Sequence, residues 1–67
     1  MKRTSMQGVL EFALEIKRKT EKAFLVTDGT ADYWLPRSMV DWEEPDHVGA
    51  TTSFYIPEWM AEEKGLI

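Results

Sequence analysis

Cysteine is absent from the 67 residues of this sequence, so no disulfide can stabilise the fold and no thiol can act as a nucleophile or metal ligand. A chain without cysteine fits a reducing compartment, and we expect a cytoplasmic protein. No apolar stretch reaches the ~18 residues of a membrane span, because Glu11 and Glu15 interrupt the only candidate, so neither secretion nor a membrane partner is expected. The length predicts a single domain over residues 1–67, with residues 1–6 frayed.

Residues suited to catalysis are also scarce. Histidine occurs once, at His47, and without a second histidine or a cysteine it is expected to be a solvated loop residue. The four glycines are isolated, which excludes a glycine-rich phosphate loop. The acidic stretch 41–46 lacks the ligand register of a calcium loop. A domain this small has little room for a cleft with converging polar groups, so we expect no enzyme, no metal and no cofactor.

Charge is distributed unevenly along the chain, whose net charge is −4. Residues 1–22 carry a net charge of +3, whereas residues 23–67 carry −7. An acidic chain is a poor general binder of nucleic acid, because binding requires a concentrated basic surface that neutralises several phosphates. A short basic edge remains, and its candidate phosphate contacts are Lys17, Arg18, Lys19 and Lys22.

Residues 9–18 alternate between apolar and mixed side chains, which is the period of a half-buried strand. The same stretch also fits an amphipathic helix, because its charged residues fall within one helical face. The apolar run 23–26 that follows is too short for a helix and ends at Asp28-Gly29, a strong signal for a tight hairpin turn. We therefore favour a meander of strands at 9–18, 22–27 and 31–35, the last of which Pro36 ends.

The second half of the chain predicts one further strand and a helix. Residues 38–42 are expected to form a single helical turn, and residues 41–49 a polar loop. Residues 51–56 alternate and are rich in β-branched and aromatic side chains. Pro57 and Gly65 bound a short C-terminal helix whose charges match its dipole. The predicted fold is mostly β, a small bent antiparallel sheet or SH3-like or OB-like partial barrel of about four strands with a short C-terminal helix.

Aromatic residues are the conspicuous excess. The couples Tyr33–Trp34 and Phe54–Tyr55 lie on predicted strands, where neighbours point to opposite faces, so one ring of each couple is expected outside. Such a ring is costly unless another chain, a base or a ligand covers it, or the C-terminal helix folds back over it. Because so small a domain buries only ~60% of its surface, we expect a homo-oligomer, a dimer or larger. The candidate partner-binding residues are Trp34, Arg37, Trp42, Tyr55, Trp59, Asp41, Glu43 and Glu44.

Three segments of the sequence contain motifs that also occur together in other proteins. Residues 20–26 contain a lysine-alanine-aliphatic strand, residues 34–38 read Trp-Leu-Pro-Arg-Ser, and residues 56–66 contain an Ile-Pro-Glu-Trp helix that ends in glycine-leucine. As an ensemble they resemble a group of short phage- and prophage-borne proteins of unassigned function. The resemblance implies a mobile-element origin, a bacterial host cell and a small accessory role, and it transfers no catalytic residues. The acidic stretch 41–46 and the N-terminal strand depart from the group's pattern.

These observations support three hypotheses about binding. The first is a non-enzymatic accessory protein that binds a host protein, as an inhibitor or anti-defence factor, through the acidic stretch 41–46 and the exposed aromatics. The second is an oligomer that sequesters a nucleotide, with Trp34 or Trp59 stacking on the base and an exposed Arg37 or Lys22 holding phosphate. The third is a small barrel that binds single-stranded nucleic acid, against which the net charge argues. We favour the first.

Overall fold

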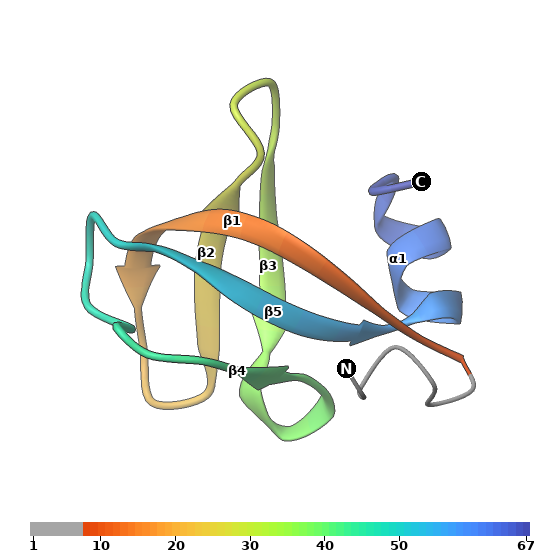
Figure 1. Ribbon diagram of the computed structural model, residues 1–67, viewed down its shortest axis with the longest axis horizontal. Helices are drawn as coiled ribbons and strands as arrows, with labels where there is room; N and C mark the ends of the chain where they lie inside the picture. Colours follow the sequence, from red (N-terminus) through yellow and green to blue (C-terminus); the bar gives the residue numbers. More distant parts are fainter. Residues whose placement is uncertain (1–7) are drawn as a thin grey trace.

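The longest strand, β1 (Val9–Lys19), lies at the centre of the sheet (Figure 1). The structure is a computed structural model that describes residues 8–67, so the expected fraying of residues 1–6 lies outside the described part. One open sheet of five antiparallel strands has the order β3-β2-β1-β5-β4. The other elements are β2 (Ala23–Thr27), β3 (Asp32–Pro36), a 3₁₀ turn η2 (Arg37–Met39), β4 (Asp41–Trp42), β5 (Thr51–Pro57) and α1 (Glu58–Lys64). The mostly β fold class is confirmed.

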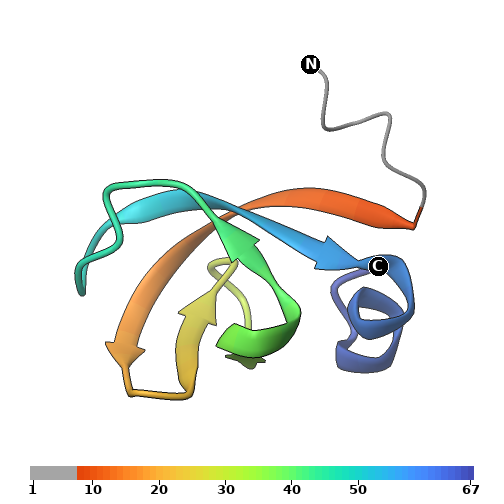
Figure 2. The ribbon, with the colours of Figure 1, turned by 90° about the horizontal axis from the view of Figure 1, so that it is seen from below.

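Strand β1 holds both halves of the sheet together. Its pairing with β5 runs from Val9 to Glu15, and its pairing with β2 begins at Glu15 and ends at Lys19. The register with β2 shifts between Ile16 and Arg18, and a bulge of this kind bends a strand. Figure 2 shows the result, a sheet bent so that β2 and β3 lie below β1 and β5. The strand interpretation of residues 9–18 is confirmed, and the helix alternative is wrong.

The core occupies the inner face of this bend. Alternation along the strands brings fully buried side chains from four of them together: Leu14, Ile16, Phe24, Val26, Leu35, Phe54 and Ile56. The rings of Phe24 and Phe54 meet edge to face with centroids 5.4 Å apart, an arrangement that suits the charge distribution of aromatic rings. The inward and outward sets of β1 and β5 are therefore those that the period of two predicts.

Helix α1 packs against the core through Met60 and Ala61, which are both buried. It ends at Gly65, whose φ of 85° is readily adopted only by glycine, and the Leu66 N–H then donates to the carbonyl of Ala61 at 2.8 Å. Because α1 lies on the core side, Trp34 on the outer face stays 45% exposed. Within residues 8–67 no helix is long and apolar enough to cross a membrane.

Two local expectations are wrong, the helical turn at residues 38–42 and the start of the polar loop at residue 41. Residues 38–42 do not form one helical turn: the 3₁₀ turn covers Arg37–Met39, no side chain caps it, and Asp41–Trp42 form strand β4. The hairpin expected at Asp28-Gly29 is present between β2 and β3, and its loop, residues 28–31, is one residue longer than expected. The Asp28 carboxylate accepts the N–H groups of Thr30 and Ala31 at 2.9 and 3.0 Å, which stabilises this wider loop.

Candidate functional site

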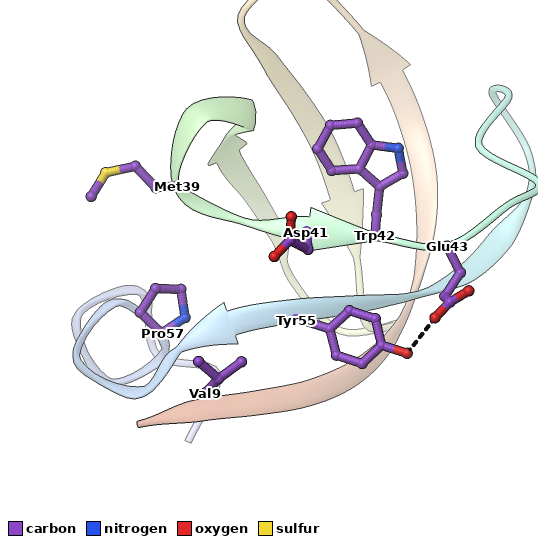
Figure 3. A pocket seen from close by; sticks show the side chains of 7 residues that line it. All are labelled: Val9, Met39, Asp41, Trp42, Glu43, Tyr55 and Pro57. Carbon is purple, nitrogen blue, oxygen red and sulfur yellow. Dashed lines mark hydrogen bonds between the residues drawn. The ribbon is translucent and has the colours of Figure 1, made fainter. Parts of the chain in front are cut away.

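A groove of about 310 Å³ lies on the outer face, where β4 and β5 meet the start of β1 (Figure 3). The register pairs Asp41 of β4 with Tyr55 of β5, so these two side chains are neighbours on the same face. Glu43 follows β4, and its N–H donates to the carbonyl of Ser53 at 3.0 Å, which continues the ladder beyond the strand. The lining residues are Val9, Met39, Asp41, Trp42, Glu43, Tyr55 and Pro57.

The polar part of the groove is built around one aromatic ring. The hydroxyl of Tyr55 donates a hydrogen bond to Oε2 of Glu43 at 2.7 Å, which fixes the ring along β5 (Figure 3). Asp41 is exposed beside the same ring. Two carboxylates and a ring face all attract positive charge, so this arrangement favours a cation over an anion.

The remaining walls are apolar. Val9 and Pro57 are half-buried at the ends of β1 and β5, and they pair with each other in the sheet. Met39 leaves the 3₁₀ turn with 45% of its surface exposed, and its flexible thioether can adapt to different shapes. The combination suits a side chain with an apolar stem and a charged end, which describes lysine and arginine.

Trp42 borders the groove, but its side chain packs against the core. Figure 3 shows its indole directed away from Tyr55. The ring packs edge-on against Phe24 with centroids 4.8 Å apart, and its Nε1 donates to Asp46 at 3.1 Å. This hydrogen bond is the largest cause of the lowered pKa of Asp46. Trp42 and Asp46 thus hold the loop after β4 in place.

Arg37 is half-buried, and the expectation that it would be exposed is wrong. Its guanidinium carbon lies 4.4 Å from the centre of the Phe24 ring and 5.5 Å from that of Trp42. The Nε atom is buried and makes no hydrogen bond. Because a planar guanidinium stacks well on rings, Arg37 covers one side of the aromatic core.

The predicted phosphate contacts are partly neutralised by carboxylates. Lys17 lies 3.5 Å from Asp32, and Lys19 lies 3.7 Å from Asp46. Arg18 and Lys22 are exposed, and neither makes an ion pair with another residue in the range 8–67. Lys22 and Arg37 also line a second, open hollow of about 570 Å³, together with Glu21, Pro36 and Ser38.

The other candidate residues lie outside the groove. Trp34 occupies the outer face of β3, and Trp59 on α1 is 53% exposed. Glu44 is exposed, and it does not line the groove. His47 is exposed in the loop, with Nδ1 3.0 Å from the carbonyl of Val48. In the described part of the chain, no group of three histidine or acidic side chains is close enough to hold a metal ion.

Three lining residues are absent from the sequence-based candidates: Val9, Met39 and Pro57. The alternation of β5 places Pro57 on the same face as Tyr55, and the antiparallel pairing brings Val9 opposite Pro57, so both positions follow from the pattern once the pairing is known. Met39 carries no such signal, because it belongs to a short 3₁₀ turn whose direction depends on the whole fold.

Comparison with known proteins adds no relative. No family model, no curated protein and no solved structure matches this chain. The interpretation of the groove therefore depends on its own geometry and charge.

Proposed function

We propose that this chain is a non-enzymatic accessory protein that binds another protein by holding a lysine or arginine side chain of that partner in the groove. The supporting observation is the hydrogen-bonded pair Tyr55 and Glu43 beside Asp41, which sets two carboxylates at the edge of one aromatic ring. A cation over a tyrosine ring gains about 0.5–2 kcal/mol, depending on how far it is desolvated. The same carboxylates repel phosphate, which disfavours a nucleic-acid ligand in this groove.

The rest of the groove supports the same class of partner. Met39 and Pro57 offer apolar surface to the methylene stem of a basic side chain. The resemblance to phage- and prophage-borne proteins extends the proposal: the partner is a host protein, the protein acts in the bacterial cytoplasm, and binding inhibits the host factor.

The test uses an array of short peptides that each carry one arginine or lysine, followed by titration calorimetry on the strongest. We expect binding to weaken at least about tenfold in the double variant Asp41→Asn/Glu43→Gln, because two attractive charges are lost. Glu44→Gln is the matched control, since Glu44 is an exposed acidic residue outside the groove. Equal losses in the control and the double variant, or no peptide that binds, would contradict the proposal.

Two further comparisons separate charge from shape. Replacing the basic residue of the peptide with norleucine keeps the apolar stem and removes the charge, so binding is expected to be lost. Tyr55→Phe removes the hydrogen bond to Glu43 but keeps the ring, and we expect a loss of about two- to fivefold, as for one modest charge-assisted hydrogen bond. Higher salt should weaken the interaction, because an exposed groove is screened.

A nucleotide is the second candidate ligand, and one observation favours it. Lys22, Arg37 and Ser38 line the same hollow of about 570 Å³, a volume within the usual range for small-ligand sites. The packing of Arg37 on Phe24 limits what its guanidinium can offer to a phosphate. Tryptophan fluorescence measured with mono-, di- and cyclic nucleotides tests this candidate, with Lys22→Gln as the variant and Lys64→Gln as the control. Unchanged fluorescence throughout would exclude it.

A further inference from the structure

The outer face of β2 and β3 carries a compact apolar block. The register pairs Leu25 with Trp34 and Ala23 with Pro36, and all four side chains lie on the face opposite the core. Trp34 is 45% exposed, and the other three are half-buried. We call these residues the Trp34 strip: Ala23, Leu25, Trp34 and Pro36.

Charged residues surround the Trp34 strip. Arg18 of β1 pairs with Leu25 and so borders the strip along one side. The ion pair between Lys17 and Asp32 lies toward one end, with the two side chains 48% and 47% exposed. Glu21 and Lys22 lie in the turn at the other end, next to Ala23. The border therefore contains both signs of charge.

An apolar centre with a charged border of mixed sign has the composition of a protein–protein interface. A surface for nucleic acid would instead concentrate basic residues, and Asp32 and Glu21 oppose that. A patch that contains both positive and negative residues can also be complementary to a second copy of itself. A two-fold axis places each region of the patch opposite another region of the same patch in the second copy.

We infer that the Trp34 strip is the interface of a homodimer, in which a second copy of this chain covers the strip about a two-fold axis. The basic border residues Arg18 and Lys22 of each copy then face the acidic border of the other, which carries Glu21 and Asp32. The contact removes the exposed part of the Trp34 ring from water, the strongest apolar contribution that this face offers. It also adds buried surface to a domain too small to bury much alone.

The size of the strip predicts a weak dimer. Together with its border, the strip extends over the five-residue strands β2 and β3 and onto β1, about 17 by 14 Å of sheet, which is less than the roughly 800 Å² per copy of a stable interface. We therefore expect dissociation that depends on protein concentration. The groove belongs to β4 and β5, on the far side of β1 in the sheet order, so the dimer leaves it open. The two proposals can consequently fail independently.

The first test compares two tryptophan variants by sedimentation velocity over about a hundredfold range of protein concentration. We expect the natural chain to shift from monomer toward dimer as concentration rises, and Trp34→Lys to remain monomeric. Trp59→Lys is the matched control, because Trp59 is somewhat more exposed than Trp34 but lies on α1, and this variant should dimerise normally. Circular dichroism checks that both variants are folded. A natural chain that stays monomeric throughout, or a Trp34→Lys variant that dimerises normally, would overturn the inference.

The second test leaves Trp34 intact and uses the absence of cysteine. Ala23→Cys introduces a single thiol inside the strip, and Ser53→Cys introduces one on β5, also half-buried and facing outward. A flexible bismaleimide should link two copies of the Ala23→Cys variant much faster than two copies of Ser53→Cys. Equal rates would overturn the inference. So would a monomer that binds a single-stranded oligonucleotide through Trp34, because nucleic acid would then be the occupant of the strip.

Discussion

The indole Nε1 of Trp42 donates a hydrogen bond to the carboxylate of Asp46 across 3.1 Å, and this bond ties the loop after β4 to the aromatic core. The same indole packs on Phe24, so this side chain links the loop to the centre of the molecule. Lys19 lies 3.7 Å from Asp46, which adds a weaker attraction from β1. Asp46 therefore has the structural role of holding this loop against the aromatic core.

We predict that Asp46→Ala lowers the Tm and increases amide hydrogen exchange in the loop over residues 43–49. The Trp42 N–H loses its acceptor, and Lys19 loses its counter-charge. Glu44→Ala is the control, because Glu44 is an exposed acidic residue of the same loop, and its Tm should stay within about 1–2 °C of the natural chain. Asp46→Asn keeps an acceptor and should fall between the two. A Tm for Asp46→Ala equal to that of the control would disprove the structural role.

The hydrogen bonds to the Asp28 carboxylate in the loop between β2 and β3 should make the stability of the fold depend on pH. The N–H groups of Thr30 and Ala31 and the Thr30 hydroxyl all donate to the Asp28 carboxylate, and these bonds lower its pKa. A carboxyl whose pKa is lower in the folded state stabilises the fold above its unfolded pKa, and this contribution is lost as the pH falls through the folded pKa.

We accordingly expect Asp28→Asn to have a lower Tm than the natural chain at neutral pH, because the amide is a weaker acceptor and carries no charge. The difference in Tm should narrow as the pH falls below about 4, where the Asp28 carboxyl of the unfolded chain begins to gain its proton while that of the folded chain stays ionised. Thermal unfolding followed by circular dichroism from neutral to acid pH measures it. A difference that stays constant down to about pH 2 would show that the carboxylate does not have this role.

How far the sequence predicts this structure depends on whether the determining contacts are local. The alternation of residues 9–18 indicates which side chains of β1 face the core, and it holds because one face of the strand is buried. The same rule separates Trp34 from the inward-facing Tyr33 and Leu35. Strand β4 is different, since it has only two residues and exists through its pairing with Tyr55 and Phe54. No pattern within residues 41–42 can reveal a partner strand that lies further along the chain.

The candidate site likewise contains some residues that the sequence identifies and others whose position depends on contacts between distant segments. Asp41 and Glu43 are candidates as part of the acidic stretch 41–46, and Tyr55 as one ring of an aromatic couple on a strand. The β4–β5 pairing brings the three together. Arg37 misleads at the sequence level, because a basic residue after proline in a short turn is ordinarily exposed. Its position against Phe24 results from the pairing of β3 with β2, which carries Phe24, and from the 3₁₀ turn that begins directly after β3. Packing of this kind becomes visible only in three dimensions.

Substitutions of Arg37 can separate two contributions to stability, the shielding of the Phe24 ring by its side chain and the effect of its positive charge. Its buried Nε makes no hydrogen bond, a deficit that costs about 1–3 kcal/mol, while its planar group shields Phe24. We predict that Arg37→Met, which keeps the cover and removes the unsatisfied donor, leaves the free energy of unfolding unchanged or higher. Arg37→Ala exposes the ring and should lower it by about 1–2 kcal/mol. Urea unfolding measures both, and equal losses in the two variants would show that the charge is what stabilises the fold.

Phe24 is the residue on which most of these contacts converge. Its ring is fully buried and touches the rings of Phe54 and Trp42 on the inside of the bend, with the Arg37 guanidinium over its face. Truncating a buried phenylalanine to alanine costs about 3–5 kcal/mol. A domain of this size has a total stability of only about that amount, so we predict that Phe24→Ala is unfolded at 25 °C.

Phe24→Leu removes less side-chain volume than Phe24→Ala, although it also loses the edge-to-face ring contacts. This variant should remain folded, with a free energy of unfolding lower by about 1–2 kcal/mol than that of the natural chain. Val48→Ala, at a loop position 56% exposed, is the control and should change stability by less than about 0.5 kcal/mol. Near-ultraviolet circular dichroism reports the packing of Trp42 in each variant. A folded Phe24→Ala with an unchanged Trp42 signal would mean that the two halves of the sheet are held together by β1 pairing alone, without the aromatic cluster between them.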